Sequence, residues 1–259
     1  MKPSVFGEVK ALLEEKVEQF NQLSFIRQDP ISVPHLFSKK QDIEIAGFLA
    51  ATIAWGQRPT ILKNANWLVK QMDLDPHAFI LHHSVSERER FVKFVHRTFN
   101  GTDCMFFLES LQNIYIQYSS LEDLFLEKDD TSNTDYLHSI MNWRAFFFTI
   151  PSPCRTQKHF SNPSQGSAAK RVNMFLRWMI RADSHGVDFG IWKKANPSRL
   201  ICPLDVHSGR VARKLKLLTR PANDWKAAIE LTEALRKMDS VDPVKYDFAL
   251  FGLGAFERF

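Results

Sequence analysis

The apolar positions of the chain recur with the period of an α-helix over most of its length. In residues 4–23 they return every three or four positions with Glu and Lys between them, as in an amphipathic helix. Alternation with a period of two, which is typical of a half-buried strand, is almost absent. We therefore predict an all-α protein. Helices are expected at 4–23, 41–55, 60–72, 76–97 (as short pieces), 102–118, 121–128, 134–149, 168–183, 206–218, 224–238 and 242–256.

Short polar residues and glycines mark the expected ends of these helices. Thr102 or Asp103 is predicted to cap the helix that follows it, and Asp224 and Asp242 are further predicted caps. Gly56 is expected to end the apolar helix before it. These signals set the boundaries of the predicted elements.

One stretch interrupts the helical pattern for longer than any other. It is the segment 151–167, which contains three prolines and four serines. A loop of this length within a compact domain is often functional. It is also the clearest shift in composition along the chain. We expect a single all-α unit over residues 1–259, and two lobes within it would be joined near 150–166.

Composition narrows the class of protein. The 259 residues are 44% hydrophobic and 24% charged, which is typical of a soluble globular chain. No run approaches ~20 apolar residues, so no membrane span is expected. The charged N-terminal segment lacks the apolar core of a signal peptide. The formal net charge of +5 permits a polyanionic partner, although many solvated surfaces carry such an excess.

The cysteines argue against a thiolate metal site. Cys104, Cys154 and Cys202 are far apart, and no C-x-x-C pair exists. We expect reduced thiols in a cytoplasmic protein, with no metal ion.

The first candidate for chemistry is the turn of residues 55–59. Here Trp55 and Gly56 are followed by Gln57 and Arg58, which would project from a rigid helix end. An amide and a guanidinium in that position are able to enter a duplex or contact phosphate. The alternative is a helix end followed by an ordinary polar turn.

The second candidate is the helix start near residue 170. A loop that contains Gly166 leads into Lys170 and Arg171. The free N–H groups of a helix start attract phosphate, and a partly desolvated lysine acts as a nucleophilic amine. The alternative is a solvated lysine on an amphipathic helix. Lys245, on the last predicted helix, is a second candidate nucleophile.

The third candidate is the segment 200–218, in which Asp205 and His207 precede the basic residues Arg210 and Arg213. On their own, the carboxylate and the imidazole are typical of helix capping and packing. Together with Lys170, they supply what cleavage of an N-glycosidic bond in DNA requires: an amine nucleophile, a carboxylate and a basic surface. Aromatic side chains would hold the extruded base. The candidates for this role are Trp55, Trp178, Trp192 and several phenylalanines. The alternative is that they belong to the core, as most aromatic residues of an all-α protein do.

Three stretches resemble, in the same chain order, the helix-hairpin-helix superfamily of base-excision DNA glycosylases. They are "EIAGFLAATIAWGQRPTILKNA", "GSAAKRVNMFLRWM" and "CPLDVHSGRVARKL". The resemblance implies two helical lobes around a cleft, with Gln57 inserted into the duplex, Lys170 as nucleophile and Asp205 as catalytic carboxylate. The implied function is DNA repair by excision of a damaged base, such as an oxidised purine, from double-stranded DNA. The chain also looks like members of an uncharacterised bacterial family.

The sequence departs from the superfamily pattern at the hairpin. The usual L-P-G-V/I-G form is replaced by "NPSQGSAAKRV", in which the lysine follows the single glycine by four residues instead of two. The longer spacing from Lys170 to Asp205 resembles the archaeal 8-oxoguanine glycosylase branch. The C-terminal four-cysteine cluster of some relatives is absent, so no cofactor is expected.

Two other functions are compatible with the sequence. A nucleic-acid-binding protein that retains the glycosylase fold without its chemistry would bind DNA in a salt-dependent way but would not need Lys170. A helical protein with no nucleic-acid role would have its basic residues scattered over the surface. The fold alone does not decide between these functions.

Overall fold

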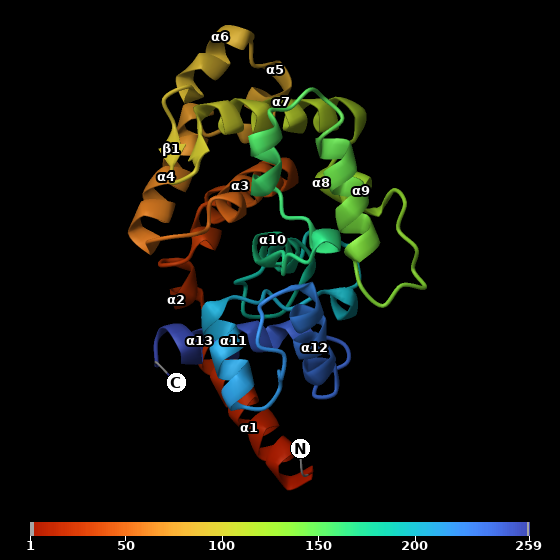
Figure 1. The fold of residues 1–259 in the computed structure, drawn as a ribbon. Coiled ribbons are helices and arrows are strands. Elements are labelled where there is room, and N and C mark those ends of the chain that lie inside the picture. The colour runs from red at the N-terminus through yellow and green to blue at the C-terminus, as the bar shows by residue number, and fades with distance from the viewer. Residues whose placement is uncertain (1–2, 258) are drawn as a thin grey trace. The chain divides into compact units, whose positions relative to one another are not determined.

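The computed structural model describes residues 3–257 and 259, and they are mostly helical (Figure 1). The all-α class predicted from the sequence is confirmed. The α-helices are α1 (Pro3–Phe20), α2 (Leu23–Ile26), α3 (Lys40–Thr52), α4 (Arg58–Gln71), α5 (Pro76–His82), α6 (Val85–Arg88), α7 (Gly101–Gln117), α8 (Leu121–Leu126), α9 (Leu137–Phe147), α10 (Lys170–Ile180), α11 (Val206–Lys214), α12 (Trp225–Arg236) and α13 (Tyr246–Ala255). Strands β1 (Val95–His96) and β2 (Phe99–Asn100) pair as an antiparallel hairpin.

The chain forms two compact units. Unit 1 comprises the described residues of 1–25, 133–136 and 162–259, and unit 2 comprises 26–132 and 137–161. The chain leaves unit 2 for unit 1 after residue 161, within the irregular segment 151–167 that the sequence marks. The other points where the chain changes unit have no comparable shift in composition.

The core of unit 1 is built around α13. Helix α1 packs along α13, and α11 packs against it as well. The contact with α1 is close, because a Cβ atom on Gly252 would lie 2.1 Å from the Phe20 ring. Phe175, Trp178 and Phe248 are fully buried. This packing brings residues from both ends of the chain into one core.

The core of unit 2 is an aromatic cluster. Phe48 of α3 stacks on Phe107 of α7 with ring centroids 5.8 Å apart, and Trp143 of α9 lies 5.0 Å from Phe48. Phe147 and Phe160 complete the cluster. These rings pack α3, α7 and α9 against one another. The turn that follows α3 therefore begins at a firmly packed helix.

The boundary between α3 and α4 differs from the prediction. Helix α3 ends at Thr52 instead of Trp55, its C-cap is Ile53 instead of Gly56, and α4 begins at Arg58 instead of Thr60. Pro59 explains the early start, because proline is tolerated in the first turn of a helix and breaks it later. Gly56 lies in the connecting turn with φ +106°, a conformation that favours glycine.

Capping was predicted correctly at one helix. Asp224 caps α12 by accepting a hydrogen bond from the Ala227 N–H group. The cap of α7 is Asn100, and not Thr102 or Asp103. The Asp103 carboxylate instead accepts a hydrogen bond from the Asn100 N–H group. Asp242 precedes a short 3-10 turn before α13, but its carboxylate accepts hydrogen bonds from Arg181.

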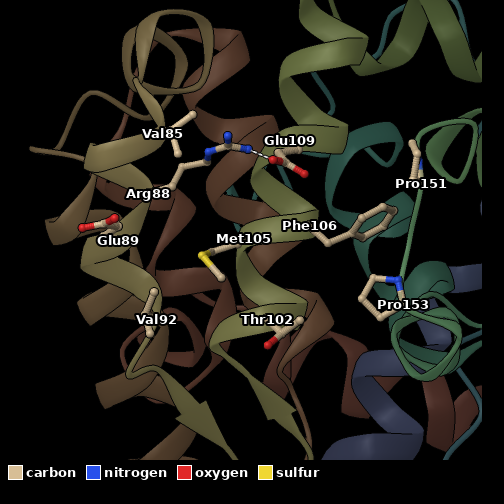
Figure 2. A pocket seen from close by; sticks show the side chains of 10 residues that line it. All are labelled: Val85, Arg88, Glu89, Val92, Thr102, Met105, Phe106, Glu109, Pro151 and Pro153. Atoms are coloured by element: carbon tan, nitrogen blue, oxygen red, sulfur yellow. Dashed lines mark hydrogen bonds and ion pairs between the residues drawn. The ribbon is translucent and has the colours of Figure 1, made fainter.

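Unit 2 carries a surface groove of about 430 Å³ between α6 and α7 (Figure 2). Arg88 and Glu109 form an ion pair on one side, and Phe106 faces Pro151 and Pro153 on the other. None of the candidate residues from the sequence lines this groove. Within the described residues, no helix is both long and apolar enough to cross a membrane.

Candidate active site

Lys170 is the first residue of α10, and the loop before it fixes where that helix begins. Ala169 has φ +48°, which is left-handed, so the helix starts two residues later than predicted. The loop is tied down at Gly166, whose carbonyl accepts a hydrogen bond from Trp225. Asn173 donates from its side chain to the Ala168 carbonyl. The Lys170 backbone is therefore held from both sides.

The Lys170 side chain lies between a thioether and a carboxylate. Its Nζ donates to Met174 Sδ at 3.2 Å, one helical turn further along α10. The same nitrogen is 4.0 Å from Asp205 Oδ2. The two side chains of this ion pair are 26% and 23% exposed, so solvent and a ligand have access to both. Lys170 and Asp205 thus converge, although 35 positions separate them.

Asp205 is the N-cap of α11, and its two carboxylate oxygens have different tasks. Oδ1 accepts hydrogen bonds from the N–H groups of His207 and Ser208 at 2.8 and 3.0 Å. Ser208 Oγ accepts in return from the Asp205 N–H group, which completes a capping box. Oδ2 faces Lys170. The capping role and the position beside a nucleophilic amine are therefore compatible.

A second carboxylate, that of Asp247 at the start of α13, is buried close to this pair. Asp247 Oδ2 accepts a hydrogen bond from Arg177 Nη1 at 2.5 Å, and its Oδ1 is 3.9 Å from Cys202 Sγ. Burial raises the pKa of the Asp247 carboxyl to about 6, and the charges of Arg177 and Lys170 act in the opposite direction. Asp247 is not among the candidates that the sequence selects, although Lys245 on the same predicted helix is.

The two arginines of α11 donate hydrogen bonds to other parts of unit 1. Arg210 Nη2 donates to the Gly254 carbonyl at 2.9 Å, which ties α11 to α13. Arg213 donates to the carbonyls of Arg220 and Ala222 and to the side chain of Asn223. Both belong to the basic surface that the sequence predicts beside Asp205, and part of their hydrogen-bonding capacity is used within the chain.

The remaining candidates of unit 1 differ in exposure. His207 is exposed, with its ring 6.3 Å from that of Phe251. Gly166 is also exposed and has φ +87°. Arg171 is half-buried, and burial lowers the pKa of its guanidinium to about 10.

The turn of unit 2 has one exposed candidate. Gln57 is exposed and its side chain makes no capping hydrogen bond, whereas Arg58 is half-buried. Trp55 is half-buried, with its ring stacked on His159 and edge-on to His96. The Trp55 carbonyl accepts a hydrogen bond from His96 Nε2 at 3.0 Å. His96 therefore supports the turn from the β1–β2 hairpin, which sequence reasoning did not foresee.

Three further expectations do not fit the structure. Trp178 and Trp192 are 0% and 1% exposed, so neither ring is able to hold an extruded base. Lys245 is a poor nucleophile because its Nζ is bound to Asp239 at 2.8 Å and Glu14 at 3.2 Å. Burial opposes its charge, but these hydrogen bonds prevail and raise the pKa of Lys245 above its usual value.

The described residues contain no cluster of three or more His, Cys, Asp or Glu side chains placed to hold a metal ion. Cys104 and Cys202 are buried and Cys154 is exposed, and all three are free thiols. The arrangement in unit 1 consists of an amine, an adjacent carboxylate and a buried second carboxyl. Together these groups are able to carry out nucleophilic attack and charge stabilisation.

Comparison with known proteins gives one match. A family model described as "Protein of unknown function (DUF2400)" matches residues 29–256. None of the curated proteins and none of the solved structures matches the chain. The matched range contains Gln57, Lys170, Asp205 and Asp247.

Proposed function

We propose that the chain, which belongs to the family described as Protein of unknown function (DUF2400), is a DNA glycosylase with an associated lyase step. It excises a damaged base, such as an oxidised purine, from double-stranded DNA. The observation that carries the proposal is the convergence of Lys170 Nζ and Asp205 Oδ2 at 4.0 Å, in a position that is partly exposed.

In this proposal Lys170 is the nucleophile. Its neutral amine attacks C1′ of the sugar, and the N-glycosidic bond breaks with its electron pair leaving on the base. A Schiff base then forms between Nζ and C1′ as the C1′–O4′ bond of the sugar ring breaks, and a proton passes from the nitrogen to O4′. Asp205 Oδ2, beside the amine, stabilises the positive charge that develops on the sugar. The hydrogen bonds on Oδ1 hold the carboxylate in place for this role.

Two DNA contacts are proposed for unit 2 by itself: Gln57 inserts into a duplex, and Arg58 contacts the backbone of the duplex. Gly166, Arg171 and His207 flank the Lys170–Asp205 pair. Arg210 and Arg213 act mainly by holding α11 and the loop after it, because their guanidinium groups donate to the chain itself.

Borohydride trapping tests the proposal directly. Duplexes that carry 8-oxoguanine, uracil or an abasic site are mixed with the protein and reduced, and a covalent protein–DNA species is sought. We expect a species that is lost in Lys170→Gln and retained in Lys193→Gln, which removes an exposed lysine of the same unit. A species that persists in Lys170→Gln would show that another amine is the nucleophile.

The alternative, a DNA-binding protein without the chemistry, gives a different result. It predicts salt-dependent binding of these duplexes, no base release with any of them, and the same affinity for the wild type and Lys170→Gln. Base release without trapping would indicate a glycosylase that lacks the lyase step.

A further inference from the structure

The tip of the β1–β2 hairpin in unit 2 carries an arginine in an unusual backbone conformation. The pairing of His96 with Phe99 leaves Arg97 and Thr98 as a two-residue loop, and Arg97 has φ +55°. A positive φ at the first position of such a loop is ordinarily provided by glycine, asparagine or aspartate, because a larger side chain is strained there. Strain of this kind is often retained at a functional site, so the arginine needs an explanation.

The Arg97 side chain lies against the turn that precedes α4. A Cβ atom on Gly56 would be 3.1 Å from both Cδ and Nη1 of Arg97. The absence of a side chain on Gly56 therefore lets the guanidinium rest close to the backbone of the turn. Gln57 is the next residue, and it is exposed and makes no capping hydrogen bond. The guanidinium of Arg97 thus lies beside the turn from which Gln57 projects.

Hydrogen bonds of His96 hold the hairpin against this turn. His96 is 1% exposed, and its Nε2 donates to the Trp55 carbonyl at 3.0 Å. Its Nδ1 accepts from the Asn64 amide at 2.9 Å, and the same amide group donates to the Val95 carbonyl at 3.3 Å. Both ring nitrogens of a neutral imidazole are satisfied in this way. The hairpin and the turn therefore present Arg97 from a fixed position.

A second arginine fixes the other residue of the loop. Arg155 Nη2 donates to the Thr98 carbonyl at 2.7 Å and lies 3.3 Å from Oδ2 of the buried Asp103. The Asp103 carboxylate also accepts a hydrogen bond from Thr156 Oγ1 at 2.7 Å. Arg155 is thus ion-paired, whereas the exposed Arg97 makes no ion pair within the part of the chain that the structure describes. The charge of Arg97 is available to a partner outside the chain.

The chemistry of this surface favours a partner with repeated negative charges. A guanidinium presents a planar fork of N–H donors that matches two oxygens of a phosphate. Its surroundings add positive charge, because Arg58 begins α4 and the exposed Arg155 and Lys158 lie on the 3-10 turn Cys154–His159. The Asp103 carboxylate is buried beneath them. A phosphate backbone fits this arrangement better than a single carboxylate does.

We propose that Arg97 binds a phosphate of duplex DNA next to the place where Gln57 inserts. The inference rests on the proposed function for duplex DNA as the partner, and it adds a contact residue that the sequence did not indicate. The contact belongs to unit 2 by itself. The strained loop is retained, in this view, because it keeps the guanidinium beside Gln57.

The first test is the salt dependence of binding, measured by fluorescence anisotropy on a duplex that carries an uncleavable tetrahydrofuran analogue of an abasic site. In Arg97→Gln the slope of log Kd against log salt concentration should decrease by about one, since each neutralised phosphate contributes about 0.9. Lys128→Gln removes an exposed lysine of the same unit and should leave the slope unchanged. An unchanged slope in Arg97→Gln would overturn the inference, as would a wild type that does not bind.

The variant Arg97→Gly separates binding from folding. Glycine adopts a positive φ without strain, so the midpoint of urea unfolding should be no lower than that of the wild type. Binding of the duplex should nevertheless weaken as much as in Arg97→Gln. A variant that unfolds more easily and binds as tightly as the wild type would show that Arg97 serves the hairpin alone.

The contacted phosphate is located by replacing the phosphates around the abasic-site analogue with uncharged methylphosphonates, one at a time along both strands. One replacement should weaken binding of the wild type and leave the affinity of Arg97→Gln unchanged, because the variant has already lost that contact. Equal losses in both proteins at every position would contradict the proposed contact.

These measurements are independent of the chemistry at Lys170. A reduced slope in Arg97→Gln together with no borohydride trapping would leave the phosphate contact standing and reject the glycosylase. Trapping that depends on Lys170, together with an unchanged slope in Arg97→Gln, would support the glycosylase and reject the contact.

Discussion

At the scale of single residues, the two carboxylate oxygens of Asp205 have different partners. One oxygen caps α11 and the other faces Lys170. The sequence predicted both interpretations as alternatives, and the structure makes them compatible. Substitutions at this position separate them, because asparagine retains the capping oxygen and removes the charge.

We expect Asp205→Asn to leave the free energy of unfolding nearly unchanged and to abolish base excision. Asp205→Ala should lose excision as well and should also lower the free energy of unfolding by about 1 kcal/mol, because the α11 cap is gone. Urea-induced unfolding and an excision assay on the same preparations measure the two effects. Retained excision in Asp205→Asn would remove the carboxylate from the proposed chemistry.

Arg213 is expected to behave as a structural residue. Arg213→Ala removes hydrogen bonds to two backbone carbonyls and to Asn223, so the free energy of unfolding should fall by about 1–2 kcal/mol. The slope of log Kd against log salt concentration, measured by fluorescence anisotropy, should be unchanged. A slope reduced by about one would instead mean that Arg213 contacts phosphate.

The site residues that the sequence predicted are those whose own segment carries a recognisable signal. Lys170 and Asp205 were identifiable because one begins a helix after a glycine loop and the other precedes a basic helix. Asp247 was not, since nothing in its own segment distinguishes it from an ordinary first-turn carboxylate. Its burial depends on Arg177 and Cys202, which the fold brings to it from distant positions.

At the scale of elements, two helical glycines have opposite environments. A Cβ atom on Gly101, at the start of α7, would lie 2.0 Å from the carbonyl oxygen of Val92. The same atom on Gly7, in α1, would meet nothing within 4 Å. The first glycine allows a close approach between backbones, and the second only lowers helix propensity.

Alanine substitutions at these glycines should therefore have opposite signs. Gly101→Ala is expected to lower the free energy of unfolding by about 2–3 kcal/mol, because backbone atoms must move to admit the methyl group. Gly7→Ala is expected to raise it by about 0.5–1 kcal/mol. Urea unfolding at one pH measures both, and a stabilised Gly101→Ala would contradict the close approach at Val92.

The existence of the long helices was predicted better than their ends. The apolar periodicity identified α1, α7, α10 and α12, because it reflects a face that must be buried. The end of α3 was placed three residues late, since Ile53 to Trp55 are apolar but leave the helix in a tight turn. The β1–β2 hairpin escaped notice because two-residue strands are too short to show alternation.

At the scale of the whole molecule, two carboxyls give the stability a dependence on pH with opposite signs. The pKa of Asp247 is about 6, above the ordinary 3.8, so the folded chain binds its proton first. The resulting contribution of Asp247 to the free energy of unfolding is fully present below about pH 4 and is lost as the pH rises through 6. Burial alone would raise the pKa of Asp239, but hydrogen bonds from Lys245 and two backbone N–H groups bring it to about 2. Its contribution is present above pH 4 and is lost toward pH 2.

We expect the combined contribution of these two groups to the free energy of unfolding to be greatest near pH 4. Asp247→Asn should reduce the slope of the free energy of unfolding against pH between pH 4 and 6. Asp239→Asn should reduce this slope between pH 2 and 4. The comparison uses the slope of the free energy of unfolding against pH from urea titrations, because each substitution also removes a hydrogen-bonding partner. An unchanged slope between pH 4 and 6 in Asp247→Asn would show that another group titrates there.

The division of unit 1 between the two ends of the chain has a consequence for its biosynthesis. Residues 26–161, which contain all of unit 2, leave the ribosome before α10 is made. Helix α1 is translated long before α13, its packing partner, so Val9, Leu13 and Val17 are covered only when α13 has been made. Until then α1 offers an apolar face to chaperones, and unit 1 acquires its core, together with Asp247, only as α13 emerges.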